Sequence, residues 1–335
     1  SKMEHLDLLK ETANKMVEKG KGILAADESN PTCGKRFESI GVDSTYENRN
    51  EYRDMLLSTE NLENYISGVI MYDETFRQST TCKNKIPFTE FLEEKGIIPG
   101  IKVDSGAKNL AGFTNEKVTE GLDGLRERLQ EYFNLGARFA KWRSVVNISD
   151  SLPSISAIEA NTHALARYAA LCQENSIVPI VEPEVLMDGS HTVERCYEVT
   201  SQTLDILFDQ LSKFNVMLEG IILKPNMVIS GLLCSEQANI EKVADLTVKC
   251  FKDNVPASVA GIAFLSGGQS SDLATEHLNY MNKKYNSLPW NLTFSYGRAL
   301  QQDALNAWGG SNRIDAQNEL LKRAKNNSLA TLGEY

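Results

Sequence analysis

The sequence predicts a single-domain (β/α)8 barrel, the TIM-barrel class of α/β protein. Three observations predict it: the chain holds eight short β-rich runs, amphipathic helices lie between them, and most runs are apolar without alternation. Continuous apolar runs are typical of parallel strands that are covered on both faces. A length of 335 residues suits one large barrel. We expect one domain over residues 1–335, with an N-terminal helical segment at 3–19 and a C-terminal helical segment at 299–335.

The predicted strands, in chain order, are 22–28, 65–74, 97–104, 137–143, 177–186, 218–226, 261–268 and 292–299. Apolar residues at three- and four-residue spacing predict helices over 117–135, 155–174, 192–215, 235–253, 271–284 and 299–325. The expected N-cap residues are Asp150, Ser151, Ser154 and Ser270. A doubly wound open sheet is the alternative fold. It usually has a G-x-G-x-x-G loop after its first strand, whereas this first strand ends in Ala-Asp-Glu-Ser.

Composition and charge exclude several classes of function. The net charge is -10, which disfavours nucleic acid and anionic membranes as partners. Hydrophobic runs stay well short of the roughly 20 residues that span a bilayer, and the N-terminus lacks a secretory h-region. The six cysteines form no C-x-x-C pair, which favours free thiols. We therefore expect a cytoplasmic protein with no membrane or nucleic-acid partner.

Charged side chains gather at the C-terminal ends of the predicted strands. Such ends converge on one mouth of a barrel, where catalysis takes place. Because a buried unpaired charge is costly, this crowding indicates a site. Alternation along a strand also places both charges on the same side in three of the pairs, those at 102 and 104, 141 and 143, and 182 and 184. The charges at these ends are Asp27, Asp73 with Glu74, Lys102 with Asp104, Lys141 with Arg143, Glu182 with Glu184, Lys224 and Arg298.

Lys224 is the most informative of these residues. It ends the apolar run 218–226 directly before a proline, so its ammonium group loses water and its pKa falls. Such a lysine is a candidate Schiff-base nucleophile. The alternative is a strand-end lysine that extends to solvent. A second cation nearby, such as Lys141, would help to keep Lys224 neutral and nucleophilic.

Two cationic groups flank this lysine. One group lies at the seventh and eighth strands, where phosphate sites of barrels are common. It offers a hydroxyl, glycine amides and a guanidinium, which belong to Ser266, Gly267, Gly268, Gly297 and Arg298. The other lies across the mouth, where Ser29 and Thr32 are followed by Lys35 and Arg36, with Lys102 and Arg143 able to join them. A plain turn and a solvated helix face are the alternatives for each group taken alone. Together they predict a substrate with a phosphate at each end.

The chain closely resembles class I fructose-1,6-bisphosphate aldolase, the Schiff-base-forming enzyme of glycolysis. The resemblance runs from about residue 20 to 335 and rests on long, ordered motifs: GKGILAADES, GIKVD, GARFAKWR, PIVEPE, ILKPNM, FLSGGQS and TFSYGRALQ. It implies a lyase that cleaves fructose 1,6-bisphosphate reversibly to dihydroxyacetone phosphate and glyceraldehyde 3-phosphate, with no metal or other cofactor. It also implies a homotetramer, with a dimer as the alternative.

The resemblance implies a role for each matching residue. Lys224 matches the Schiff-base lysine, Asp27 the acid/base for the C4 hydroxyl proton, Lys141 the lysine that assists carbinolamine chemistry, and Glu182 the acid/base for Schiff-base formation, with Glu184 in support. The C1-phosphate site matches Ser266, Gly267, Gly297 and Arg298. The C6-phosphate site matches Ser29, Thr32, Lys35, Arg36, Lys102 and Arg143, with Thr32 in place of the more usual serine.

Other functions remain as alternatives. Family members can act as scaffolds for cytoskeletal or membrane-pump partners, and transaldolase or deoxyribose-phosphate aldolase are other Schiff-base barrels. The four histidines show no ligand-like spacing, which argues against a metal-dependent aldolase. The family usually carries a further C-terminal tail ending in tyrosine, so Tyr335 is not assigned that tyrosine's role. The sequence leaves open the preference between fructose 1,6-bisphosphate and fructose 1-phosphate.

Overall fold

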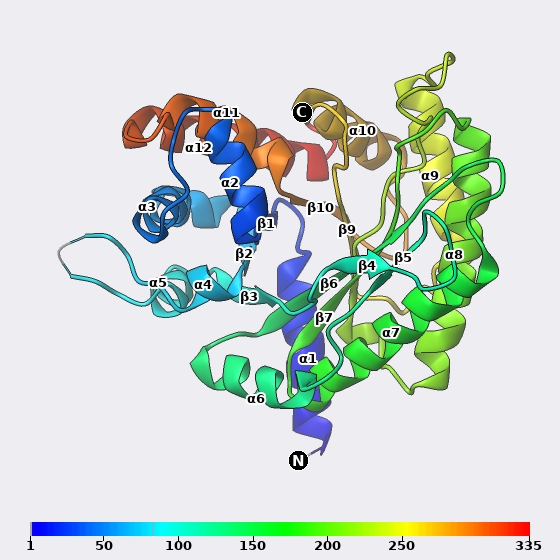
Figure 1. The fold of residues 1–335 in the computed structure, drawn as a ribbon, viewed down its shortest axis with the longest axis horizontal. Helices are drawn as coiled ribbons and strands as arrows, with labels where there is room; N and C mark the ends of the chain where they lie inside the picture. The colour runs from blue at the N-terminus through cyan, green and yellow to red at the C-terminus, as the bar shows by residue number, and fades with distance from the viewer. Residues whose placement is uncertain (1, 83) are drawn as a thin grey trace.

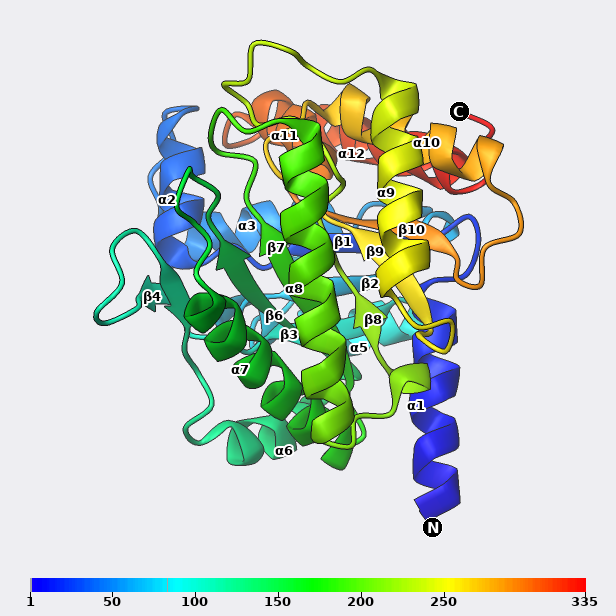
Figure 2. The ribbon, with the colours of Figure 1, turned by 90° about the vertical axis from the view of Figure 1, so that its right-hand side faces the viewer.

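A computed structural model of the protein describes residues 2–82 and 84–335. Eight parallel strands close into a barrel in which each barrel strand neighbours the next one along the chain (Figure 1 and Figure 2). The predicted single-domain (β/α)8 fold is confirmed. The barrel strands are β1 Gly22–Ala26, β2 Ile66–Met71, β3 Ile98–Lys102, β6 Phe139–Val146, β7 Val178–Val185, β8 Ile222–Leu223, β9 Gly261–Phe264 and β10 Leu292–Tyr296.

Helices surround the barrel, and α1 lies against its N-terminal end (Figure 2). The predictions for 155–174 and 271–284 match the structure, and Ser154 and Ser270 cap these two helices as expected. Asp150 and Ser151 do not cap a helix. The helices are α1 Lys2–Met16, α2 Asn30–Glu38, α3 Tyr46–Leu57, α4 Asp73–Phe76, α5 Phe88–Glu94, α6 Leu125–Leu135, α7 Ile155–Glu174, α8 Val193–Lys213, α9 Ile240–Asn254, α10 Ser271–Lys284, α11 Arg298–Trp308 and α12 Arg313–Thr331.

Two helix predictions were wrong in part. Residues 117–124 are not helical: β5 Lys117–Thr119 pairs antiparallel with β4 Ala107–Asn109, and Gly124, at φ 71°, precedes the first turn of α6. The predicted helix 299–325 is two helices, because Gly309 and Gly310 take φ values of 53° and 106° that end α11. Left-handed backbone of this kind is open to glycine at little cost and does not continue a helix.

The barrel is filled at its N-terminal end and hollow at the other. Leu9, Ala13 and Met16 of α1 form one buried cluster with side chains from six of the strands, including Phe139. The Phe139 ring fits because β3 presents Gly100 to it; a Cβ atom at that position would overlap the ring. The packed end leaves the C-terminal mouth as the face on which a ligand can reach the strand ends.

Two further expectations concern the surface and the thiols. Within residues 2–82 and 84–335, the structure contains no helix that is long and apolar enough to cross a membrane. All six cysteines are free, as their spacing predicted.

Candidate active site

A cavity of about 670 Å³ opens at the C-terminal ends of the barrel strands. Almost all of the predicted site residues line it, although they come from seven separate parts of the chain. Lys35 does not: it is exposed on α2 and is absent from the lining. The predicted residues that line the cavity are Asp27, Ser29, Thr32, Arg36, Lys102, Lys141, Arg143, Glu182, Glu184, Lys224, Ser266, Gly267, Gly297 and Arg298.

Lys224 lies at the end of β8 and is only 4% exposed. Its backbone N–H donates to the carbonyl oxygen of Val181, 2.8 Å away, which holds it beside β7. Its Nζ lies 3.5 Å from Oε1 of Glu182. Burial lowers the pKa of Lys224 and the charge of Lys141 lowers it further, while the carboxylate of Glu182 opposes the shift. The net result is a lowered pKa, which favours the neutral amine that a nucleophile requires.

Lys141 and Asp27 form a buried ion pair across the barrel. Lys141 projects from β6, and its Nζ donates to Oδ2 of Asp27, which follows β1, at 2.8 Å. Burial alone would raise the pKa of Asp27, but the ammonium groups of Lys141 and Lys224 hold it well below its usual range. Burial alone would lower the pKa of Lys141, but Asp27 and Glu182 raise it. Asp27 is therefore a carboxylate and Lys141 an ammonium near neutral pH.

The two glutamates of β7 share one arginine. Glu182 and Glu184 point to the same side, as period-two alternation predicted, and Nε of Arg143 lies 3.5 Å from Glu182 and 2.8 Å from Glu184. Burial raises the pKa of Glu184, against the opposing charge of Arg143. Oε1 of Glu182 is buried and accepts no hydrogen bond from the described residues, yet it faces Lys224 at 3.5 Å and Lys141 at 3.9 Å. One carboxylate oxygen is thus placed to exchange protons with two amines.

Polar groups at one rim of the cavity can hold an anion. Ser266 follows β9 and is buried, and Gly267 takes φ 58°, which turns the backbone under it. Gln269 braces this turn, since its Nε2 donates to the carbonyl oxygen of Ser266 at 3.1 Å. Arg298 is exposed at the start of α11, and the described residues provide no ion-pair partner for it. A free guanidinium beside a hydroxyl and a glycine turn suits a phosphate.

The opposite rim holds a second cationic group. Arg36 of α2 pairs with Glu28 at 2.8 Å, and Lys102 lies 3.9 Å from Asp104.

Sequence reasoning missed Glu28, although it follows Asp27 directly. Because β1 ends at Ala26, strand alternation no longer predicts which way Glu28 points. Met187 was also missed, and no sequence signal marks it. Its Sδ accepts the backbone N–H of Gly268 at 2.8 Å.

Three of the charges expected at the mouth lie elsewhere. Asp73 and Glu74 begin α4 and pair with Arg77 and Arg49 instead of lining the cavity. Asp104 accepts the backbone N–H of Arg143 at 3.0 Å, so it supports β6 from outside the cavity.

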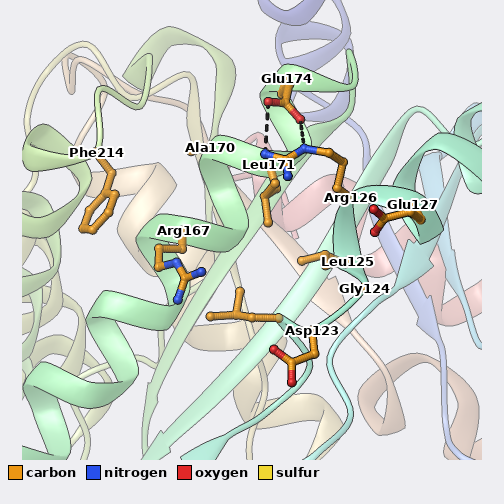
Figure 3. Close-up of a pocket in the computed structure, with 11 residues that line it drawn as sticks. Asp123, Gly124, Leu125, Arg126, Glu127, Arg167, Ala170, Leu171, Glu174 and Phe214 are labelled. Carbon is orange, nitrogen blue, oxygen red and sulfur yellow. Dashed lines mark hydrogen bonds and ion pairs between the residues drawn. The ribbon is translucent and has the colours of Figure 1, made fainter.

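A second cavity, of about 460 Å³, lies between α6 and α7 on the outside of the barrel. Figure 3 shows its single ion pair, in which the guanidinium of Arg126 donates to the carboxylate of Glu174 at 2.7 Å. No lysine lines it, and both partners of the pair are half-exposed. Over the part of the chain that the structure describes, no cluster of histidine, cysteine or carboxylate side chains is arranged to hold a metal ion. The barrel mouth is therefore the candidate active site.

Comparisons with known proteins show which family the chain is similar to. A family model described as fructose-bisphosphate aldolase class-I matches residues 8–335. A probable fructose-bisphosphate aldolase class 1 of Xanthomonas axonopodis pv. citri is 58% identical over 98% of this chain and 99% of its own. Cytosolic fructose-bisphosphate aldolase 4 of Arabidopsis thaliana is 51% identical over 94% of this chain and 80% of its own.

A solved structure is also similar. It is a ternary co-crystal structure of fructose-bisphosphate aldolase from Plasmodium falciparum, in complex with TRAP and a small-molecule inhibitor. The similarity has a TM-score of 0.97 at 47% sequence identity, and covers 99% of this chain and 96% of that one.

Proposed function

The chain belongs to the class I fructose-bisphosphate aldolase family, whose members are lyases that work through a Schiff base, and from that premise we propose that Lys224 forms the Schiff base. The observation that carries the proposal is the lowered pKa of this buried lysine together with its 3.5 Å contact to Glu182. A buried amine that is easily deprotonated, with a proton-transfer group in reach, meets the requirements of an attack on a ketone.

The reaction then uses the neighbouring groups in turn. The neutral amine of Lys224 adds to the C2 ketone of fructose 1,6-bisphosphate, and Glu182 supplies the proton with which the carbinolamine loses water. The resulting iminium withdraws electrons as the C3–C4 bond breaks. Asp27, which stays ionised because Lys141 holds its pKa down, takes the C4 hydroxyl proton as the aldehyde forms. Protonation of the enamine and hydrolysis of the iminium release dihydroxyacetone phosphate.

We assign the two phosphates of the substrate to the two rims. The C1 phosphate takes the hydroxyl of Ser266, the backbone of Gly267 and Gly297, and Arg298. The C6 phosphate takes Ser29, Thr32, Arg36, Lys102 and Arg143. Lys35 is left out of this set because it is exposed outside the cavity. Charge-assisted hydrogen bonds to phosphate justify the cations at both ends.

The assembly and location of the protein are also proposals. We propose a homotetramer in the cytoplasm, as the family resemblance implies, with a dimer as the alternative. Two Arabidopsis thaliana relatives carry the word cytosolic in their names, which supports the location. Light scattering would give four or two times the chain mass of 37.2 kDa.

Borohydride trapping tests the role of Lys224. The protein is incubated with dihydroxyacetone phosphate, reduced, digested and analysed by peptide mass. We expect one reduced adduct, on the peptide that holds Lys224, and its loss in Lys224→Met. A Lys141→Met variant, which retains Lys224, should still form the adduct. An adduct on another lysine, or none with folded protein, would contradict the assignment.

Substrate comparison tests the phosphate assignment, because fructose 1-phosphate lacks the C6 phosphate. Arg36→Ala should raise KM for the bisphosphate and leave KM for fructose 1-phosphate nearly unchanged. Arg298→Ala should raise KM for both. A lost charged hydrogen bond predicts roughly a tenfold to hundredfold effect. Equal effects of Arg36→Ala on both substrates would exclude Arg36 from the C6 site.

A further inference from the structure

The strand that leads directly into Lys224 is the shortest in the barrel. β8 has two residues, and its backbone pairing with β7 covers Ile222 and Leu223. The hydrogen bond from Lys224 to Val181 is the next contact along. The next bond of a parallel ladder would run from the backbone N of residue 183 to the carbonyl oxygen of Lys224, but residue 183 is a proline and has no N–H to donate. The backbone ladder between β7 and β8 therefore stops at Lys224, which lies level with Glu182, although Glu184 lies further along β7.

The side chain of Asn226 continues this ladder. Its Oδ1 accepts the backbone N–H of Val185 at 3.0 Å, so a side-chain carbonyl stands where a backbone carbonyl would otherwise be. Among the described residues, this is the one hydrogen bond between β7 and residues 225–228. On the other side, the backbone of Pro225 is tied to β9 through the N–H of Leu265 at 3.1 Å.

The other end of the same amide is also held. Nδ2 donates to Oγ1 of Thr200 on α8 at 3.2 Å and to the carbonyl oxygen of Met227 at 3.1 Å. Asn226 is 4% exposed, so water does not compete for these bonds. Because the two donors and the acceptor of the amide face different partners, its orientation is determined and Oδ1 must face β7.

We propose that Asn226 is a positioning residue that replaces the missing β7–β8 ladder with its side chain and thereby holds Lys224 against Glu182 and Glu184. The inference rests on the proposed role of Lys224. Asn226 lies two residues after the lysine, and its partner Val185 lies one residue after Glu184. Their hydrogen bond therefore joins β7 to the segment after β8 beside the side chains that react. A misplacement of about 1 Å between reacting groups can lower a rate about a hundredfold.

Two matched variants test the proposal. Asn226→Ala removes the acceptor for Val185, and Thr200→Val removes a hydroxyl of the same network but leaves that bond in place. Asn226→Ala removes the partner of three buried groups, on Val185, Thr200 and Met227, whereas Thr200→Val removes one partner of Asn226. We therefore expect the urea midpoint to fall further in Asn226→Ala, and both variants are assayed without urea, where circular dichroism shows folded protein. Asn226→Ala should lower kcat and the single-turnover rate of borohydride trapping by roughly tenfold to a hundredfold. Its KM should change little, because the proposed phosphate ligands lie on other elements.

The outcomes separate positioning from general destabilisation. Thr200→Val should keep kcat within about twofold of the wild type. Wild-type rates in Asn226→Ala, or an equal loss in Thr200→Val, would overturn the inference while a wild-type adduct on Lys224 upheld the proposed function. No wild-type adduct would overturn both. Should the alanine variant not fold, Asn226→Ser keeps a shorter acceptor, and wild-type kcat in that variant would likewise overturn the inference.

Discussion

Replacing Lys141 with methionine should raise the pKa of Lys224. The Nζ atoms of Lys141 and Lys224 lie 3.9 Å and 3.5 Å from the same oxygen of Glu182. The two nitrogens are therefore no more than about 7.4 Å apart, and at an effective dielectric constant of about 20 their charges repel by about 2 kcal/mol. Removing that repulsion, with the carboxylate of Asp27 still present, favours the ammonium form of Lys224. The neutral fraction at a pH below its pKa should fall by a factor of about 30.

The assay is the rate of borohydride trapping with dihydroxyacetone phosphate, measured from about pH 6 to pH 10. In Lys141→Met, the midpoint of this profile should move to higher pH. If Lys141 also takes part directly in carbinolamine chemistry, its loss lowers the maximum trapping rate of the profile. That change is separate from the pH of the midpoint. Lys102→Met is the matched control, because Lys102 lines the same cavity but pairs with Asp104 instead of Glu182. Its midpoint should move less.

A midpoint that stays in place or moves to lower pH in Lys141→Met would refute this reasoning. The variant also leaves the buried carboxylate of Asp27 without its partner at 2.8 Å. Loss of one partner of a buried pair costs about 3–5 kcal/mol of unfolding free energy. Urea unfolding should show this loss, and the profile must be measured where circular dichroism shows folded protein.

Three other predictions follow from single side chains. Because the folded-state pKa of Asp27 is depressed, its carboxylate contributes stability that is present above about pH 4 and is lost as the pH falls through that pKa. In Asp27→Asn, the free energy of unfolding measured in urea should therefore decline less steeply from about pH 5 to pH 3. An aromatic disulfide reagent should modify exposed Cys82 in the native protein but reach Cys172, whose pKa burial raises, only after unfolding. His277 Nδ1 lies 2.7 Å from Oε1 of Gln269, the residue that braces the turn at Ser266. His277→Leu should therefore raise KM for the bisphosphate several-fold, whereas His277→Asn, which keeps a donor at that place, should not. Equal KM values in the two variants would contradict this.

Local and periodic information in the sequence was enough for the fold and for most of the site. Apolar runs predict where strands form, and eight of them separated by helices leave few other architectures. Charges at seven of the eight predicted strand ends are visible in the sequence, and barrel closure brings most of these ends to one mouth. The lowered pKa of Lys224 was predicted on the same basis, since a lysine at the end of a buried strand loses its water.

Long-range geometry was decided by the tertiary structure alone. The sequence does not say which lysine pairs with Asp27, since that depends on strand register and side-chain reach across the barrel. Nor does it say that Lys35 is exposed outside the cavity while its neighbour Arg36 lines it, because one residue along a helix turns the side chain through about 100°. The bond between Asn226 and Val185 joins residues 41 apart. Such contacts depend on closure of the whole barrel, and local patterns carry no record of them.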